Sequence, residues 1–231
     1  MKKFIYVFAM ILTTIGVAKA QKLDYTLGAD IVSSYVWRGA YQTSAAVQPG
    51  MGLSVAGFFI SAWGSMPFKG EAKEVDFTAA YQIKGLSFAI TDYWWEGEGA
   101  FKYFSYASGK TDHVFEGTVG YELPFEKCPI SLSWNTMFAG ADYKPSGSRA
   151  YSTYITAAYP FAIKTVDMSA SLGMTPWEGI YSDGAALVHI GLRAAKELKI
   201  TESLGLTFSG ELIANPASED IFFVFGVGIG I

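Results

Sequence analysis

The 231-residue chain predicts an all-β protein, a transmembrane antiparallel up-and-down β-barrel of about twelve strands. Three observations support this fold class. Residues 221–231 carry bulky apolar side chains at every odd position and Gly at three of the five even positions. Similar alternation recurs in segments of about ten residues along the chain. The connections between segments alternate between short turns and longer loops, which is the pattern of barrels in the bacterial outer membrane.

The first twenty residues predict a secretory signal peptide. Lys2 and Lys3 give a positive start, residues 4–17 are an apolar run, and residues 18–20 (Ala-Lys-Ala) form a small-x-small cleavage site. A membrane-spanning helix needs about 20 apolar residues, and this run is shorter. We therefore expect residues 1–20 to be removed on export and residues 21–231 to form the barrel.

The first half of the exported chain predicts five strands, at 23–35, 47–55, 58–65, 74–83 and 86–95. In four of them, apolar residues on one face alternate with polar or small residues on the other. The apolar face consists of Leu23, Tyr25 and Leu27 in 23–35, of Val47, Met51 and Leu53 in 47–55, of Val75, Phe77 and Ala79 in 74–83, and of Leu86, Phe88 and Ile90 in 86–95. The faces of 58–65 do not separate by pattern. Tight turns are expected at Ala56-Gly57 and Lys84-Gly85, where Gly supports the required backbone conformation.

The second half predicts seven more strands, at 113–123, 130–139, 151–159, 166–174, 186–194, 204–212 and 221–231. Short connections follow the even-numbered strands, and longer ones, such as 96–112, follow most of the odd-numbered strands. An even number of strands places both chain ends on the short-turn side. We therefore expect short turns at the periplasmic end and long loops at the extracellular end, with the odd residues of 221–231 on the lipid face.

Aromatic residues gather at the two ends of the predicted strands, as expected of the aromatic girdles of a membrane barrel. The long-loop ends carry Trp37, Trp63, Trp94, Trp95 and Trp177, and the short-turn ends carry Tyr25, Tyr81, Tyr121 and Tyr159. These nine residues are predicted to lie at the two membrane interfaces.

Composition excludes several function classes. Glycines and charges interrupt every hydrophobic stretch of the exported chain, which argues against a helical membrane protein although 51% of residues are hydrophobic. Cys128 has no second cysteine to pair with, so no disulfide framework is expected. Removal of the signal peptide takes away three Lys and no acid and changes the net charge from −4 to −7. This acidity argues against a nucleic-acid partner. The two histidines form no metal motif, and no cofactor or metal is predicted.

A family resemblance rests on three stretches: SSYVWRGAYQT at 33–43, GFFISAWGS at 57–65 and EVDFTAAYQ at 74–82. Together they resemble the Gcw_chp family of bacterial outer-membrane proteins, also described as TorF-type porins. The resemblance covers the first third of the exported chain. It implies a barrel with a pore and no known substrate or catalytic residue. Ile231 departs from the aromatic last residue that is general in outer-membrane barrels.

The inward faces of the predicted strands carry mainly small residues, and this favours a narrow, water-filled lumen. The predicted pore-lining charges are Asp30, Glu74, Asp76, Glu116, Glu211, His189 and Arg193. Their acidic excess predicts a mild preference for cations or polyhydroxy solutes, unless the acids pair with Arg193 or with loop bases. Arg38, in the first long loop, is predicted either to constrict the pore or to make a surface contact.

The sequence thus predicts a porin in the outer membrane of a Gram-negative bacterium that passes small hydrophilic solutes. Its expected partners are outer-membrane lipid and lipopolysaccharide, together with the barrel-assembly machinery. A non-conducting receptor or structural barrel is an alternative, in which loop 96–112 is a lid, a plug or an adhesive tip. A hydrolase is a further alternative. It requires a Ser–His pair within hydrogen-bond reach, and the sequence does not orient His113 or His189 toward a serine.

Overall fold

The computed structural model describes residues 22–95, 102–107, 111–125 and 129–231. Twelve strands of these residues close a barrel: β1 (Asp24–Val32), β4 (Ala46–Val55), β5 (Phe58–Pro67), β6 (Glu74–Ile83), β7 (Leu86–Trp95), β8 (His113–Glu122), β9 (Ser131–Gly140), β10 (Thr153–Ile163), β11 (Val166–Thr175), β12 (Ala186–Lys199), β13 (Gly205–Asn215) and β14 (Asp220–Gly230). The predicted signal peptide and Cys128 lie outside the described residues. In the described part of the chain, no helix is long and apolar enough to cross a membrane.

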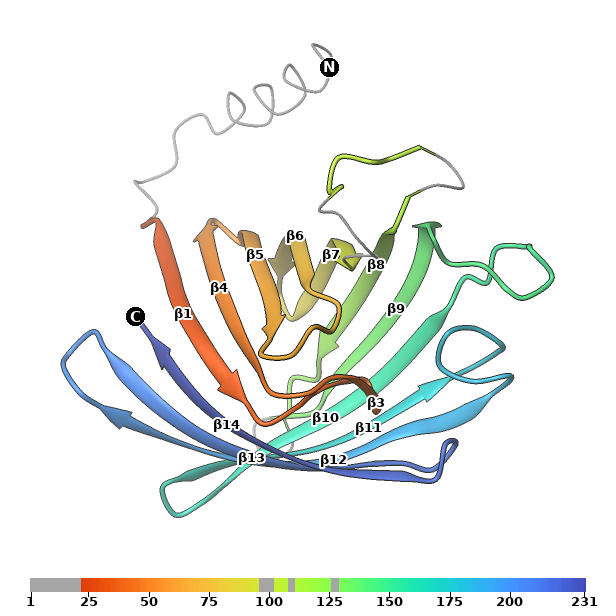
Figure 1. Ribbon diagram of the computed structural model, residues 1–231. Helices are drawn as coiled ribbons and strands as arrows, with labels where there is room; N and C mark the ends of the chain where they lie inside the picture. Colours follow the sequence, from red (N-terminus) through yellow and green to blue (C-terminus); the bar gives the residue numbers. More distant parts are fainter. Residues whose placement is uncertain (1–21, 96–101, 108–110, 126–128) are drawn as a thin grey trace, which may run out of the picture.

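The barrel is antiparallel throughout, and β1 closes it by pairing with both β4 and β14. Figure 1 shows the strands as a curved wall, with the end of the chain in β14 beside the β1 strand. This confirms the predicted all-β class, the strand number and the up-and-down order. Short turns join the strands at one end, which we call the short-turn end, and the opposite end carries the longer loops.

β10 and β12 extend furthest beyond their predicted bounds. β10 continues past Pro160 to Ile163, and β12 continues to Lys199. Pro160 is tolerated because β10 pairs with β9 only as far as Ala158, so the proline lies where β10 has β11 as its partner. A residue without an N–H group fits a strand where that side is not paired.

The predicted tight turns are confirmed. Ala56 and Gly57 have φ angles of 58° and 83°, and Lys84 and Gly85 have φ angles of 50° and 82°. Two successive residues with positive φ make the two-residue hairpin turn whose twist matches that of the flanking strands.

The two faces of the wall follow the predicted alternation. The apolar residues assigned to the outside are exposed, as Leu53, Phe77 and Phe223 show. On the inside of β14, Gly226 and Gly228 are buried and pair across to Asp30 and Val32 of β1. The structure also resolves the faces of β5: Phe58, Ile60 and Met66 are exposed outside, whereas Trp63 points into the barrel.

The sequence-based prediction missed one element. Between β1 and β4 the chain forms a two-stranded hairpin, β2 (Tyr35–Trp37) and β3 (Ala40–Thr43), which is not part of the wall. Figure 1 shows this segment leaving β1 and running inward to β3 before it returns to β4. We call residues 33–45 the plug.

Candidate functional site

The tip of the plug contacts the inner wall of the barrel. Arg38 and Gly39 form its turn, with φ angles of 52° and 82°. A side chain at residue 39 would collide with the backbone carbonyl of Val188 in β12, so glycine permits this close approach. The Asn215 side chain in β13 donates a hydrogen bond of 3.2 Å to the Gly39 carbonyl. The plug tip therefore contacts β12 and β13, which lie three and two strands from β1 around the ring.

Arg38 fastens this tip to the wall. Its guanidinium donates to both oxygens of Glu116 in β8, at 2.5 and 2.7 Å, and to the Tyr181 hydroxyl at 2.5 Å. It also lies over the rings of Trp37 and Tyr154, at 4.5 and 4.8 Å from their centres. The Arg38 side chain is 12% exposed and that of Glu116 is 1% exposed. Such a bidentate, buried contact is among the stronger polar contacts in proteins.

Aromatic rings fill the lumen around the ion pair. Trp37 of the plug contacts Tyr93, Tyr181 and Trp95 at centre-to-centre distances of 5.3, 5.9 and 6.0 Å. These rings pack against the buried cluster of Tyr93, Val114 and Met137. The lumen is therefore packed with side chains at the long-loop end.

The packed region holds more acid than base. Glu74, Asp76 and Glu116 are buried and face inward, and Arg38 pairs with Glu116. Within the described residues, Glu74 Oε1 and Asp76 Oδ1 have no hydrogen-bond partner. Glu116 also accepts from the Tyr93 hydroxyl at 3.1 Å. This part of the lumen therefore carries an acidic excess.

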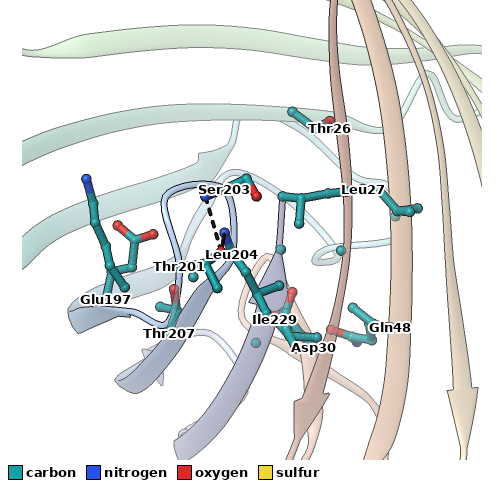
Figure 2. Close-up of a pocket in the computed structure, with 18 of the residues that line it drawn as sticks. Thr26, Leu27, Asp30, Gln48, Glu197, Thr201, Ser203, Leu204, Thr207 and Ile229 are labelled. Carbon is teal, nitrogen blue, oxygen red and sulfur yellow. Dashed lines mark hydrogen bonds between the residues drawn. The ribbon is translucent and has the colours of Figure 1, made fainter.

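A cavity of about 690 Å³ lies on the short-turn side of the plug. Figure 2 shows Asp30 and Gln48 on neighbouring strands at one side, with Glu197 and the turn around Thr201 at the other. Trp63 and Arg193 also line it. The remaining lining includes glycines of four strands: Gly28, Gly50, Gly205, Gly228 and Gly230. The lumen is thus hollow at one end and filled at the other.

The inward acids and bases fall into two groups. Asp30 and Arg193 line the cavity. The packed region holds the other group, Glu74, Asp76, Glu116 and Arg38. These predicted charges therefore lie at two levels of one lumen. Glu211 lies opposite Arg193 in the register of β12 and β13. Their roles in conduction stay predictions.

The structure brings a serine and a histidine together inside the barrel. Ser171 Oγ and His189 Nε2 are 2.9 Å apart. Glu211 lies on the same side: its carboxylate, Ser171 Oγ and His189 Nε2 all surround the space above Gly191. His189 Nδ1, the atom that an orienting carboxylate would contact, has no partner in the described part of the chain. No group of three or more potential metal ligands occurs among these residues.

The outer wall carries a second polar pair under a loop. His113 faces outward, with Nδ1 at 2.7 Å from Asp92 Oδ1. Residues 102–107 cover it: His113 Nε2 contacts the Tyr103 carbonyl at 2.5 Å, and the Tyr106 ring stacks on the imidazole at 4.2 Å. The described part of loop 96–112 therefore lies against the outer wall, and the segment that fills the lumen is residues 33–45. Residues 96–101 and 108–110 lie outside the described residues.

The predicted tryptophan girdle requires correction. Trp37 and Trp95 pack inside the barrel, and Trp63 lines the cavity, so these three do not lie on the outer rim. Trp94 is 2% exposed and contacts Tyr103. Trp37, Trp63 and Trp95 differ from the prediction because the plug folds inward and creates a second aromatic environment inside the long-loop end of the barrel. Trp177 is exposed, and so are three of the four tyrosines at the short-turn end: Tyr25, Tyr121 and Tyr159. Tyr81 is partly exposed on the outer face.

The plug had a recognisable signal in the sequence. Residues 35–43 read Tyr-Val-Trp-Arg-Gly-Ala-Tyr-Gln-Thr, in which β-forming residues flank an Arg-Gly pair. A residue followed by Gly between two such runs is a hairpin pattern. The pattern predicts the hairpin itself but not its inward direction, which depends on contacts with residues as far away as Asn215.

No family model and no curated protein matches the chain, so the Gcw_chp resemblance stays a prediction. Three solved structures are similar in fold. OmpF of Salmonella typhi, in complex with daunomycin, is 9% identical over 91% of this chain and 98% of its own, with a TM-score of 0.38. An outer membrane channel from Pseudomonas putida F1 is 11% identical over 93% of this chain and 97% of its own, with a TM-score of 0.46.

The third is Wzi of Escherichia coli, an outer-membrane protein of capsule assembly described as a carbohydrate-binding β-barrel. It is 12% identical over 90% of this chain and 56% of its own, with a TM-score of 0.32. Likeness at this level of identity concerns the fold, and the TM-scores carry no argument about ligands or transport.

Proposed function

We propose that this protein is a channel of the bacterial outer membrane, which passes small hydrophilic solutes when the plug leaves the lumen. The observation that carries the proposal is the arrangement of the lumen. A polar cavity occupies one end, and the segment that closes the other end is a hairpin outside the wall sheet, held at its tip by Arg38. Such a segment is able to move without breaking the wall.

The outer surface supports a membrane location. Large apolar side chains point outward around the ring, for example Leu27, Phe88, Leu172 and Leu212. In water this band would be an aggregation hazard, whereas lipid stabilises it. The proposal includes outer-membrane lipid and lipopolysaccharide as surroundings, and insertion by the barrel-assembly machinery.

The part of the lumen that the plug now fills is proposed to favour cations over anions once the plug has left it. When the plug withdraws with Arg38, it leaves Glu74, Asp76 and Glu116 on the wall without the base that now faces Glu116. Carboxylates on the wall of a narrow pore attract cations. In a planar bilayer with a salt gradient, the reversal potential of the opened channel should show cation selectivity, and anion selectivity would contradict this part of the proposal.

The plug is tested by removing its anchor. Arg38→Ala leaves Glu116 buried without its partner, a loss of about 3–5 kcal/mol in comparable buried pairs, so the plug should detach. We expect low single-channel conductance for the natural protein and more frequent or larger openings for the variant. Arg149→Ala is the matched control, because Arg149 stacks on Tyr143 in an outer loop and lies outside the lumen.

Deletion of the plug gives the second arm. Replacing residues 34–44 by a short Gly-Ser linker should produce a permanently conducting barrel. The plug also favours a second candidate function, a non-conducting receptor or structural barrel. If both variants insert as folded barrels and neither conducts, the channel proposal is wrong and this second function is favoured.

A further inference from the structure

We propose that the cavity on the short-turn side of the plug is a binding site for a neutral polyhydroxy solute of about one or two sugar rings, with Trp63 as its stacking surface. This inference rests on the proposed function, since it names the class of solute that the lumen receives. The argument uses the shape of the cavity, the position of Trp63, the polar groups beside it and the balance of charge.

The shape of the cavity favours binding. Its mouth is lined by the turn around Ser203 and by the chain end at Ile231. At the inner end, Trp63 contacts Tyr35 of the plug, with 5.4 Å between the ring centres. A solute that enters from the short-turn end therefore meets a wall while the plug is in place. Such a solute occupies the cavity instead of passing through it.

Trp63 offers a flat surface at this inner end. The indole Cδ1 lies 3.5 Å from the point that a Cβ on residue 50 would occupy, so the ring lies beside the Gly50 backbone at van der Waals distance. The negative face of an aromatic ring attracts the weakly positive C–H groups on the face of a sugar ring. Gly28 and Gly228 line the same cavity, and the Asp30 carboxylate fills the place that a side chain at residue 228 would take.

Polar side chains of suitable chemistry line the same cavity as Trp63. Asp30 supplies a carboxylate, Gln48 an amide and Arg193 a guanidinium. Each of these groups is planar and has the capacity for two parallel hydrogen bonds, which matches two neighbouring hydroxyls of a sugar. The Gln48 amide already donates one hydrogen bond of 3.3 Å to Ser65. Among the described residues, no hydrogen bond or ion pair occupies Asp30 or Arg193, although Arg193 lies opposite Glu211.

The charges of the cavity favour a neutral solute. The acids are Asp30, Glu197 and Glu202, and the bases are Arg193 and Lys199. These side chains leave an excess of one acid, whereas Glu74, Asp76 and Glu116 against Arg38 leave an excess of two in the packed region. The cavity side chains therefore attract a cation less strongly than the packed region does. A solute with many hydroxyls and no charge uses both the donors and the acceptors of this lining.

Isothermal titration calorimetry on the detergent-solubilised full-length protein tests the site. The probes are glucose and maltose, with glycerol as a polyol that has no ring, and lysine and glutamate as charged solutes. We expect the sugars to bind more tightly than glycerol and than either charged solute. Binding of glycerol as tight as that of the sugars, or preferred binding of a charged solute, overturns the inference.

Variants locate the binding. Trp63→Ala should weaken sugar binding roughly tenfold, the equivalent of about one aromatic contact, while Trp63→Phe should retain most of it. Trp177→Ala is the control, because Trp177 is exposed outside the lumen. Asp30→Asn keeps the shape and removes the charge, and it should weaken sugar binding less than Trp63→Ala does. Unchanged binding in Trp63→Ala refutes the site, and if that variant does not fold, Trp63→Phe and Asp30→Asn decide.

The two proposals fail separately. Cation-selective conductance without sugar binding refutes the solute site and leaves the channel intact. Sugar binding that depends on Trp63, in a protein whose plug variants never conduct, refutes the channel and supports a binding barrel.

Discussion

At the scale of single residues, Arg38 shows what sequence patterns indicate and what they omit. The pattern placed it in the first long loop, as a charge that would constrict the pore or contact the surface. Its partner Glu116 is 78 positions away, and no local pattern connects the two. Arginine suits this place because its planar fork reaches both Glu116 oxygens and Tyr181 together, which a lysine ammonium does not do.

Facing within most strands, β5 excepted, follows in contrast from the sequence alone and is testable residue by residue. Val119 is 48% exposed on the outer face, and its neighbour Thr118 faces inward and donates to Asn135 at 2.9 Å. Val119→Arg should lower the free energy of unfolding in lipid vesicles by about 2–4 kcal/mol if the site lies near the membrane midplane.

Thr118→Lys is the matched change, and it should lower the free energy of unfolding by about 1 kcal/mol through the lost hydrogen bond to Asn135. Urea titrations of both variants in the same vesicles provide the comparison. A larger loss for Thr118→Lys than for Val119→Arg would mean that the facing of β8 is reversed.

At the scale of elements, the wall strands and the connecting loops differ in how far they are predictable. A strand reveals itself through local alternation, and the bounds of β6 and β7 agree with the prediction. The direction of a loop depends on distant contacts. The plug folds inward to the Arg38 partners, and residues 102–107 fold outward over Asp92 and His113. These loops decide the candidate site, so the site was less predictable than the fold.

The base of the plug has an acid-sensitive contact. Glu71, in the loop between β5 and β6, accepts hydrogen bonds from the Ser44 hydroxyl and from the Ser44 backbone N–H, the latter at 3.0 Å. The Ser44 hydroxyl bond, followed by the backbone bond, holds the pKa of the Glu71 carboxyl below its ordinary value of 4.5. A lowered pKa means that the contact stabilises the fold fully above that ordinary value and is lost as the pH falls through the folded-state value.

Acidification from about pH 6 to about pH 3 should therefore loosen the plug base. Hydrogen exchange measured by mass spectrometry, corrected for intrinsic rates, should show faster exchange of the Ser44 amide at the lower pH. Glu71→Gln cannot ionise, so its exchange at Ser44 should be fast at both pH values. The same pH response in both proteins would show that Glu71 does not control this contact.

At the scale of the whole molecule, the closed ring follows from the even number of strands and the bare face of β14. The sequence predicted that Gly226 and Gly228 would lie on the lumen wall, and the structure confirms it. The strength of the closure was not predictable, because register is a property of the pair. β14 pairs with β13 from Gly205↔Gly230 to Asn215↔Asp220, but it pairs with β1 only from Gly28↔Gly230 to Val32↔Gly226. The β1–β14 junction, which we call the seam, is therefore the shorter of the two junctions that β14 makes.

This asymmetry provides a test within one strand. Phe225 and Ile231 direct their backbone groups to β1, where Ser33 donates to the Phe225 carbonyl at 2.8 Å and Ile231 donates to the Leu27 carbonyl at 2.9 Å. Since backbone groups alternate along a strand, the odd-numbered amides of β14 point to β1 and the even-numbered amides point to β13.

The barrel should open first at this seam, because local opening breaks the junction with the fewest contacts. We therefore expect the amides of Val227 and Ile229 to exchange faster with deuterium than those of Gly226 and Gly228, measured residue by residue by NMR in detergent micelles. Both sets lie in the same strand at the same depth, so access of solvent from the membrane surface does not explain a difference. Equal protection of the two sets would show that β14 leaves β1 and β13 together and that the ring has no preferred opening point.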